Sequence, residues 1–200
     1  MSTNQSISSN IQSIPLGEPF STSLFLKLGS RAAVDKSLSR LVQEGSIERI
    51  TQGIYIRPKT NRFIGSVKPE VGKVIQAIAE SNGETIQVHG AEAVRRFKLS
   101  TQMPTQPTYY TSGSSRELTI GQLKIKLIHA TQRKLQLAGK RSGLALSALW
   151  YLGKDGATRQ AIEQVHSQLD PTEINELLAA DKPAWLSIAI EKHCKRHINI

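Results

Sequence analysis

Basic and polar side chains recur along residues 31–44 at spacings that place them on the outer face of a helix. Val34, Leu38 and Leu41 fall on the opposite, apolar stripe, which would pack against neighbouring helices. The alternative is that the outward charges only keep this face in contact with water. The outward residues that could bind phosphate or read base edges in the major groove are Ser30, Arg31, Lys36, Ser39, Arg40 and Gln43.

Residues 47–57 add a second set of candidate contacts. Two short β-branched runs, 47–50 and 54–57, flank Gly53 and predict a β-hairpin. Its polar side chains could lie along a nucleic-acid backbone or in a minor groove, and an arginine that donates two hydrogen bonds to guanine discriminates by roughly 1–3 kcal/mol. These residues are Arg49, Thr51, Gln52, Arg57 and Lys59. Ser30 and Arg31 lie at the expected start of the preceding helix, where free amides and the helix dipole favour a phosphate.

No arrangement of residues supports an enzyme. The sequence lacks the GxxxxGK[ST] phosphate loop and the GxSxG motif, and no carboxylate pair is marked as an acid and a base. His193 and His197 could share a helical face and bind zinc beside Cys194, but no glutamate stands in the HExxH position and neighbouring cations repel a metal. We expect a solvated tail there, and we predict no catalytic residue, no metal and no cofactor.

Three aromatic residues in the C-terminal third, Trp150, Tyr151 and Trp185, stand at helical positions. Such side chains usually pack in a core or at a contact between domains. The other interpretation is a platform on which nucleic-acid bases stack. We favour core or domain packing for these three residues.

The helix over 31–44 and the hairpin after it need a scaffold, which the preceding residues can supply. Apolar residues at helical spacing predict one helix before Pro15 and a second between Pro19 and Gly29. Ser30 is a suitable N-cap for the third helix, and Gly45 stands where a left-handed residue would end it. Three helices followed by a hairpin predict a winged helix-turn-helix over residues 1–62. The first two helical faces are marked by Ile7, Ile11, Ile14, Phe20, Leu24 and Leu28.

Residues 63–200 are predicted to form a second domain of the α+β class. Residues 61–68 have the composition of a linker, and a helix is expected to begin at Pro69 and to end at Asn82 and Gly83. Short β-branched runs then predict strands, with one short helix between the first two. These elements are strands at 85–88, 108–111, 118–120 and 123–128 and a helix at 91–97.

The last part of the chain is predicted to be helical. A wide apolar face runs over 144–152, and three further helices are expected at 157–169, from 171 and at 184–193. Asp170, Pro171 and Glu173 combine an N-cap, a first-turn proline and a capping-box glutamate. The predicted fold class is therefore α+β, with an N-terminal winged helix-turn-helix followed by an α+β domain with C-terminal helices.

Positive charge is concentrated in the first two thirds of the 200-residue chain. There are 26 Lys and Arg against 16 Asp and Glu, which gives a formal net charge of +10. Residues 1–62 carry a net +4, residues 63–141 a net +7 and residues 142–200 a net −1. This balance favours a partner rich in phosphate or other negative charge.

Three features indicate a cytoplasmic protein without a membrane partner. Cys194 is the single cysteine, so no internal disulfide can form. The first residues have neither the cations nor the apolar block of a secretory signal. The longest near-apolar run, 144–152, is about half the ~20 residues that a membrane-spanning helix needs.

Several motifs resemble the AbiEi-type antitoxin family. In the first domain they are SRAAVDKSLSRL at 30–41 and GIY at 53–55, with Gly45, Ile47 and Arg49 between them. In the second domain the motifs occur in the order of the family's antitoxin domain, and the resemblance spans nearly the whole chain. They are HGAEA at 89–93, LSTQMP at 99–104, YTSG at 110–113, SGLAL at 142–146 and PAW at 183–185.

This resemblance implies a non-catalytic bacterial antitoxin of the type IV toxin–antitoxin and abortive-infection class, which acts in phage defence. The winged helix would bind inverted repeats of double-stranded DNA in its own promoter and repress transcription. The second domain would counteract a nucleotidyltransferase-like toxin. Matched to this sequence, the DNA-facing residues fall on Arg31, Lys36, Arg40 and the wing at 49–57.

Other functions stay open at this point. A stand-alone winged-helix regulator, or a protein-interaction module that never touches DNA, would have the same sequence features. A neighbouring gene for a nucleotidyltransferase would favour the antitoxin, and an isolated gene would favour the regulator. An enzyme that processes RNA or transfers nucleotides has no supporting site in the sequence.

Overall fold

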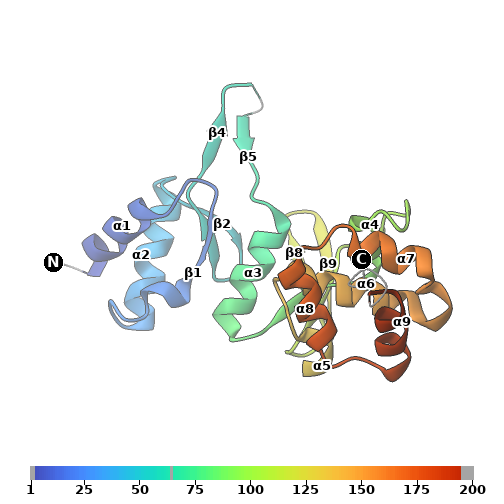
Figure 1. The fold of residues 1–200 in the computed structure, drawn as a ribbon. Helices are drawn as coiled ribbons and strands as arrows, with labels where there is room; N and C mark the ends of the chain where they lie inside the picture. Colours follow the sequence, from blue (N-terminus) through green and yellow to red (C-terminus); the bar gives the residue numbers. More distant parts are fainter. Residues whose placement is uncertain (1–2, 64, 195–200) are drawn as a thin grey trace. The chain divides into compact units, whose positions relative to one another are not determined.

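The computed structural model describes residues 3–63 and 65–194, apart from the side chains of residues 193 and 194. The chain divides into two compact units, whose elements are drawn in Figure 1. Unit 1 comprises Met1–Glu84 together with Thr119–Leu123. Unit 2 comprises Thr85–Leu118 together with Lys124–Ile200.

Two helices of unit 1, α1 (Thr3–Ser13) and α2 (Arg31–Gln43), pack against each other as their apolar faces predict. Ser30 caps α2, because its hydroxyl accepts a hydrogen bond from the backbone N–H of Ala33 at 3.3 Å. Gly45 follows α2 in the left-handed region, with a φ of 72°. The side chains that the two helices bury are Ile7, Ile11, Val34, Ser37, Leu38 and Leu41.

The segment between these helices is not the α-helix that the sequence predicts. Pro19–Ser21 form strand β1, and Thr22–Phe25 form a 3₁₀-helix, η1. Phe20 and Phe25 are buried, whereas Leu24 is 59% exposed. The helix prediction is wrong because β1 hydrogen-bonds to strand β3, and this long-range pairing overrides local helical spacing.

A three-stranded antiparallel sheet of order β1–β3–β2 packs with these helices. β2 (Glu48–Thr51) and β3 (Ile54–Ile56) form the predicted hairpin, with Gly53 in its turn at a φ of 74°. All three residues of the central strand β3 are buried, whereas β2 is exposed or half-buried. A bulge between Arg49 and Thr51 shifts the register of β2.

Residues 59–67 form a second hairpin instead of the predicted linker. β4 (Lys59–Asn61) pairs antiparallel with β5 (Gly65–Val67) in a separate two-stranded sheet. Figure 1 shows this ribbon extending away from α1 and α2. Its strands are exposed apart from the half-buried Val67. The linker prediction is wrong because strands without a buried face carry no alternation of apolar residues that would reveal them.

Helix α3 (Val71–Asn82) belongs to unit 1, so the compact units divide after Glu84, whereas the predicted domains divide after residue 62. α3 contacts β1 and β3, and its Lys73 forms an ion pair with Glu18 at 2.6 Å. The division lies later in the chain because α3 packs on the sheet of unit 1. Gly83 ends α3 as predicted, in the left-handed region with a φ of 66°.

A four-stranded sheet contains the strands that the sequence predicts for the second domain, in the order β6–β7–β9–β8. β6 (Ile86–Val88) pairs antiparallel with β7 (Thr108–Thr111), which pairs parallel with β9 (Leu123–His129). β8 (Arg116–Ile120) lies on the other side of β9. Along β9, Ile125 and Leu127 are buried while Lys124 and Lys126 are exposed, as the alternation predicts.

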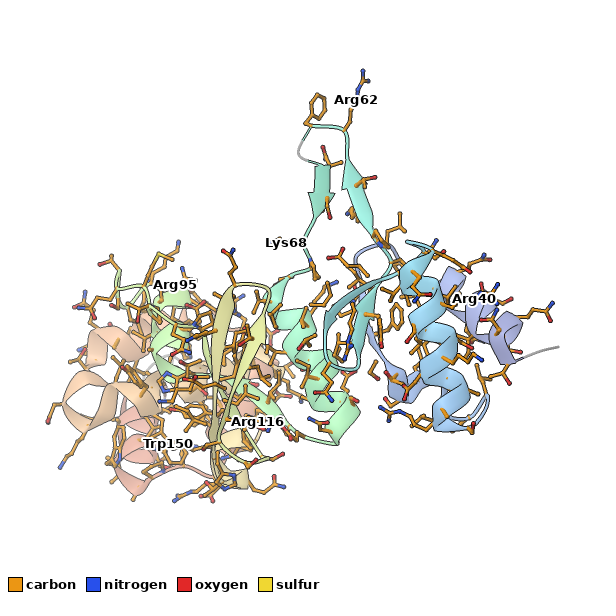
Figure 2. All side chains as sticks on the ribbon, turned by 180° about the vertical axis from the view of Figure 1, so that it is seen from behind. Arg40, Arg62, Lys68, Arg95, Arg116 and Trp150 are labelled. Atoms are coloured by element: carbon orange, nitrogen blue, oxygen red, sulfur yellow. The ribbon has the colours of Figure 1, made fainter. Side chains whose placement is uncertain are left out.

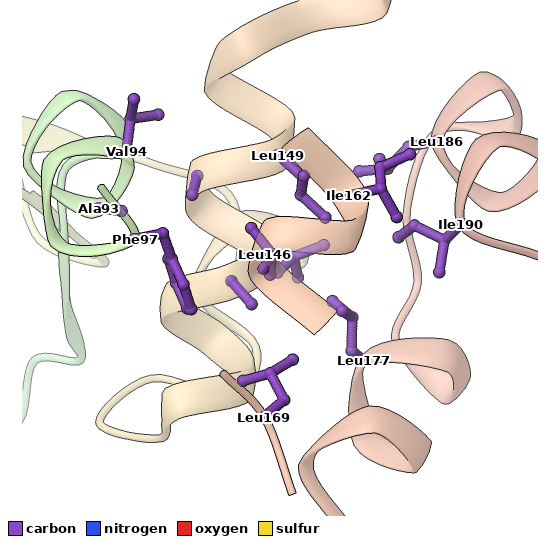
Figure 3. Close-up of a cluster of buried hydrophobic side chains, with 13 residues drawn as sticks. Ala93, Val94, Phe97, Leu146, Leu149, Ile162, Leu169, Leu177, Leu186 and Ile190 are labelled. Atoms are coloured by element: carbon purple, nitrogen blue, oxygen red, sulfur yellow. The ribbon is translucent and has the colours of Figure 1, made fainter. Parts of the chain in front are cut away.

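Helix α6 (Arg141–Gly156) occupies the centre of the apolar core of unit 2. It packs against α4 (Gly90–Arg96), α7 (Arg159–His166), α8 (Pro171–Ala179) and α9 (Ala184–Cys194). Figure 3 shows side chains of these helices meeting around α6. The largest buried members are Phe97, Leu146, Leu149, Ile162, Leu177, Leu186 and Ile190.

The start of α8 has the predicted capping box. The Asp170 carboxylate accepts a hydrogen bond from the Glu173 backbone N–H at 2.8 Å, and the Glu173 carboxylate accepts one from the Asp170 N–H at 3.0 Å. A further short helix, α5 (Gln132–Leu135), precedes α6 and is missing from the sequence prediction. Its four residues are too few for a recognisable apolar period.

The predicted fold class, α+β with C-terminal helices, is confirmed. A search of the described residues finds no helix with the length and apolar character needed to cross a membrane.

Candidate nucleic-acid interface

The outward face of α2 presents the polar residues that the sequence assigns to it. Lys36, Ser39 and Gln43 are exposed. Within the described chain the Lys36 ammonium has no carboxylate within ion-pair distance. The Ser30 hydroxyl is already engaged in capping α2, so its first role is structural. The face therefore offers one unpaired cation between neutral hydrogen-bonding groups.

The two arginines of α2 are paired with carboxylates one helical turn further along the same helix. Arg31 Nε lies 3.0 Å from a carboxylate oxygen of Asp35, and Arg40 Nε lies 3.0 Å from one of Glu44. All four side chains are about half exposed or more. Such i, i+4 surface pairs contribute only about 0.3–0.5 kcal/mol, so a phosphate can replace either carboxylate. Both arginines remain available to an anion.

The hairpin β2–β3 presents a third cation, Arg49. Its guanidinium Nε donates to the Thr51 carbonyl oxygen at 3.4 Å and has no carboxylate partner among the described residues. Gln52 is exposed and Thr51 half-buried at the turn. The turn is tied to η1, since the backbone N–H of Thr22 donates to the Gly53 carbonyl oxygen at 2.9 Å. Arg49 and Gln52 therefore stand on an anchored turn.

Arg57 has a different role from the one that the sequence analysis gives it. Its Nη1 donates to the carbonyl oxygen of Gln12 at 2.8 Å and to that of Ile14 at 2.7 Å. These carbonyls lie at the C-terminal end of α1, where a helix leaves such groups without internal partners. Arg57 therefore joins β3 to α1, and the structure does not place it with the exposed cations.

The ribbon β4–β5 contains functional candidates that the sequence analysis misses. Lys59, which was predicted, is exposed on β4, and Arg62 and Phe63 follow at the tip. Phe63 is 90% exposed, and its backbone N–H donates to the Asn61 side-chain oxygen at 2.8 Å. Figure 2 shows Arg62 at the outer end of the ribbon and Lys68 at its base, between β5 and α3.

A sequence signal for this ribbon exists in retrospect. Asn61 and Gly65 flank a short polar and aromatic stretch, and both types favour turns. A stronger signal is charge, because residues 49–69 contain Arg49, Arg57, Lys59, Arg62 and Lys68 and no Asp or Glu. A two-stranded ribbon is narrow enough to enter the major groove of DNA.

Unit 2 offers further exposed lysines away from carboxylates. Lys124 and Lys126 stand on one face of β9. Other cations of this unit are engaged: Arg95 and Arg96 both pair with Glu92, at 2.7 and 3.0 Å, and they hold the pKa of that carboxyl below its usual 4.5. The net charge of the unit therefore overstates the number of cations free for a partner.

The C-terminal histidines stay a prediction. The side chains of His193 and Cys194, and the whole of His197, lie outside the described residues. In the part of the chain that was searched, no group of three or more His, Cys, Asp or Glu side chains is arranged to hold a metal ion.

Comparisons with known proteins give a family and a similarity to a solved structure. Residues 6–177 match the model of a family described as "Family of unknown function (DUF6088)". A search of curated proteins gives no significant match. Among solved structures, the chain is similar to the crystal structure of the RV2827C protein from Mycobacterium tuberculosis, with 11% identity and a TM-score of 0.41. That similarity covers 93% of this chain and 79% of the other.

Proposed function

The chain belongs to the DUF6088 family of unknown function, and from the exposed cations of unit 1 we propose that it is a DNA-binding transcriptional repressor. In this proposal α1, η1 and α2 with the hairpin β2–β3 act as a winged helix-turn-helix. Helix α2 is the recognition helix, and β2–β3 is the wing. The ribbon β4–β5 is an additional contact beyond the wing.

The observation that carries the proposal is a run of cations without carboxylates. Residues 49–69 contain no Asp or Glu. Their exposed cations and Lys36 of α2 all belong to unit 1. None of the five has an ion pair within the described residues, so each can neutralise a phosphate without first leaving a carboxylate. They are Lys36, Arg49, Lys59, Arg62 and Lys68.

Base recognition would come from two kinds of side chain on α2: the neutral ones, and the arginines that can exchange a carboxylate for a base or a phosphate. Ser39 and Gln43 are exposed beside Lys36, and Gln can donate and accept at adenine in the major groove. Arg31 and Arg40 would leave their carboxylates for phosphate or guanine. At the ribbon tip, Phe63 has the size and exposure of apolar wedges that insert between base steps.

The antitoxin part of the proposal rests on the resemblance of the sequence motifs to AbiEi-type antitoxins. It assigns unit 2 the task of counteracting a nucleotidyltransferase-like toxin and places the chain in the cytoplasm, where its promoter is. Co-expression with the product of an adjacent nucleotidyltransferase gene tests it. Restored growth supports antitoxin activity, and growth arrest that persists at matched expression contradicts it while leaving the repressor proposal standing.

Single substitutions of the free cations test DNA binding by unit 1. We expect Lys36→Ala and Arg62→Ala each to weaken binding to duplex DNA from upstream of the gene and to lower the salt slope of log K by about 1, because each removes one phosphate contact. Fluorescence anisotropy across a salt series measures both. Lys154→Ala, which removes an exposed lysine of unit 2, is the matched control and should change neither. Unchanged slopes for both test variants would contradict the assigned interface.

A second candidate function is a protein-interaction module, which a different observation favours. Leu16, Leu24 and Leu26 of unit 1 are 53%, 59% and 41% exposed. Exposed leucines of this kind mark contact surfaces when they are grouped. Light scattering of the wild type and of Leu24→Ser tests it: loss of an oligomer in the variant supports a protein contact, and a monomer in both removes self-association from this candidate.

A further inference from the structure

A pocket of about 210 Å³ opens in unit 2 between β7, α5 and α6. Core or domain packing is the predicted role of Trp150, Tyr151 and Trp185. Trp150 and Trp185 are half-buried and pack against the core cluster of unit 2, as predicted, whereas Tyr151 is 52% exposed. Figure 2 labels Trp150 within this unit. The pocket shares no residue with the cations of unit 1. Its lining residues are Tyr110, Lys134, Leu146, Ser147, Trp150 and Tyr151.

Aromatic rings make up much of the pocket wall. The ring of His89 lies against that of Tyr110, with centroids 4.7 Å apart, and meets the ring of Tyr151 edge-on at 5.4 Å. Trp150 and Tyr151 reach the pocket from α6, and Tyr110 reaches it from β7. Several ring faces around one concavity form a surface on which a flat ligand ring can stack.

Lys134 brings a positive charge to these rings. Its Nζ lies 5.4 Å from the ring centroid of Tyr110 and 5.5 Å from that of Trp150. The neighbouring Arg133 also approaches Trp150, but its guanidinium pairs with Asp181 at 3.0 Å. Within the described chain Lys134 has no carboxylate at ion-pair distance. The pocket therefore holds a cation that two rings stabilise and that no anion neutralises.

Close packing fixes the wall that carries the aromatic residues. Gly90, at the start of α4, lies so near α6 that an added Cβ would overlap the Cβ of Tyr151 and come within 2.9 Å of the Ser147 carbonyl oxygen. Both residues line the pocket. The rings of Trp150 and Tyr151 are therefore held on a tightly packed pair of helices.

We propose that this pocket binds a nucleotide, with the base stacked on the rings of Tyr110, Trp150 and Tyr151 and the phosphate paired with Lys134. A pocket smaller than the roughly 300–1,000 Å³ of sites for drug-sized ligands accommodates a ring and leaves the sugar and phosphate at its rim. Burial raises the pKa of Tyr110, so its hydroxyl stays protonated and can donate a hydrogen bond to the base. The nucleotide is either free or an unpaired member of a single strand.

Tryptophan fluorescence tests the proposal in the full chain. Trp185→Phe leaves Trp150 as the single reporter. The probes are AMP, GMP, CMP and UMP, with adenosine and inorganic phosphate as half-ligands and a ten-nucleotide single strand as the second source. We expect saturable quenching by at least one monophosphate or by the single strand, and at least tenfold weaker binding of both half-ligands.

Substitutions at the pocket separate a nucleotide site from a general anion site. Lys134→Gln should weaken nucleotide binding about tenfold and leave weak adenosine binding unchanged, whereas Lys192→Gln, which removes an exposed lysine of α9, should change neither. Tyr151→Leu should weaken nucleotides and adenosine alike. Circular dichroism checks that each variant keeps the fold.

Several results would overturn the proposal. They are the absence of quenching by every monophosphate and by the strand at millimolar concentration, phosphate binding as tight as nucleotide binding, or equal affinity in Lys134→Gln. Quenching by the single strand alone would support the site and would identify single-stranded nucleic acid as the source of the bound nucleotide. None of these outcomes depends on duplex DNA binding, which Lys36 and Arg62 test separately.

Discussion

Arg57 illustrates how a single guanidinium can serve the fold of unit 1 and not its surface. Its two hydrogen bonds reach carbonyl oxygens at the end of α1, at 2.8 and 2.7 Å. A cation there also interacts favourably with the negative end of the helix dipole. The residue therefore holds the first helix against the sheet that carries the wing.

We predict that Arg57→Ala lowers the free energy of unfolding by about 1.5–3 kcal/mol, the range for hydrogen bonds made by a charged group. Urea unfolding measures the change. Arg62→Ala, at the exposed ribbon tip, is the control and should leave the free energy of unfolding within about 0.5 kcal/mol of the wild type. If the urea midpoint of Arg57→Ala equals that of the wild type, the structural role is contradicted and Arg57 is again a candidate DNA contact.

His89 gives unit 2 a dependence on pH. Burial, and then the charge of Lys134, hold the pKa of His89 below its usual 6.5. The unfolded chain therefore takes up this proton at a higher pH than the folded chain does, and stability falls as the pH drops below about 6.5. Its Nδ1 accepts a hydrogen bond from the Ala91 backbone N–H at 3.3 Å, so asparagine, another N-cap, is the conservative replacement.

We expect the melting temperature of the wild type to fall between pH 7.5 and pH 5.5, and that of His89→Asn to fall less. Differential scanning calorimetry at both pH values measures the two slopes. His129 and His166 are present in both proteins, so their titration cancels in the comparison. An equal change in melting temperature with pH in the two proteins would show that protonation of His89 does not destabilise the fold.

The sequence alone could predict which residues of α2 are exposed, because a helix of known phase assigns every side chain to a face. Ser30, Lys36, Ser39 and Gln43 are therefore where they were expected. It could not predict the structural role of Arg57, whose hydrogen-bond partners lie 45 and 43 positions away in the chain. It also could not show that Trp150, which packs on the core as predicted, lines a pocket as well, because helical spacing does not tell a buried face from the rim of a pocket.

At the scale of elements, predictability follows the size of the apolar signal. α2, α3 and the start of α8 carry caps and wide apolar faces, and their ends agree with the expected ones within about two residues. The residues of β1 and η1 resemble a helix in the sequence because Phe20, Leu24 and Leu28 stand at helical spacing. The ribbon β4–β5 was missed because neither of its faces is buried.

The contact of α4 with α6 supports a prediction about Gly90. We expect Gly90→Ala to lower the free energy of unfolding by about 1–3 kcal/mol, the usual cost of overpacking, because the new Cβ has no room beside Tyr151. Thermal unfolding measures it. Gly156→Ala is the milder comparison, since the nearest atom to its added Cβ is the Leu152 Cβ at 3.2 Å, a contact that a shift of a few tenths of an ångström relieves. A melting temperature of Gly90→Ala equal to that of the wild type would contradict the close packing of α4 against α6.

At the scale of the whole molecule, the two units divide the charge unequally. Unit 1 has ten basic and seven acidic residues, a net +3, and unit 2 has sixteen and nine, a net +7. The smaller charge still supports the proposed DNA binding, because five unpaired cations lie on α2, on the hairpin β2–β3 and along residues 59–68. The larger charge is consistent with an additional anionic partner for unit 2, through Lys124 and Lys126 or through the pocket at Lys134.

The division into units was predictable only in part. The two regions and their fold class follow from the order of helices and strands, which the sequence carries locally. The position of the division does not, because α3 joins unit 1 through contacts with β1 and β3. Such packing depends on residues about 50 positions earlier, whose effect no local window of sequence contains.

The affinity of the wild-type chain for two duplexes tests the central claim most directly. One duplex is taken from upstream of the gene and the other is a shuffled sequence of equal length, and anisotropy is measured at salt concentrations from 50 to 200 mM. If the chain is a DNA-binding repressor, we expect it to bind the upstream duplex about 10³-fold or more tightly than the shuffled duplex. We also expect both affinities to fall steeply as the salt concentration rises. Equal affinity for the two duplexes at every salt concentration, or no binding at 50 mM, would contradict the account.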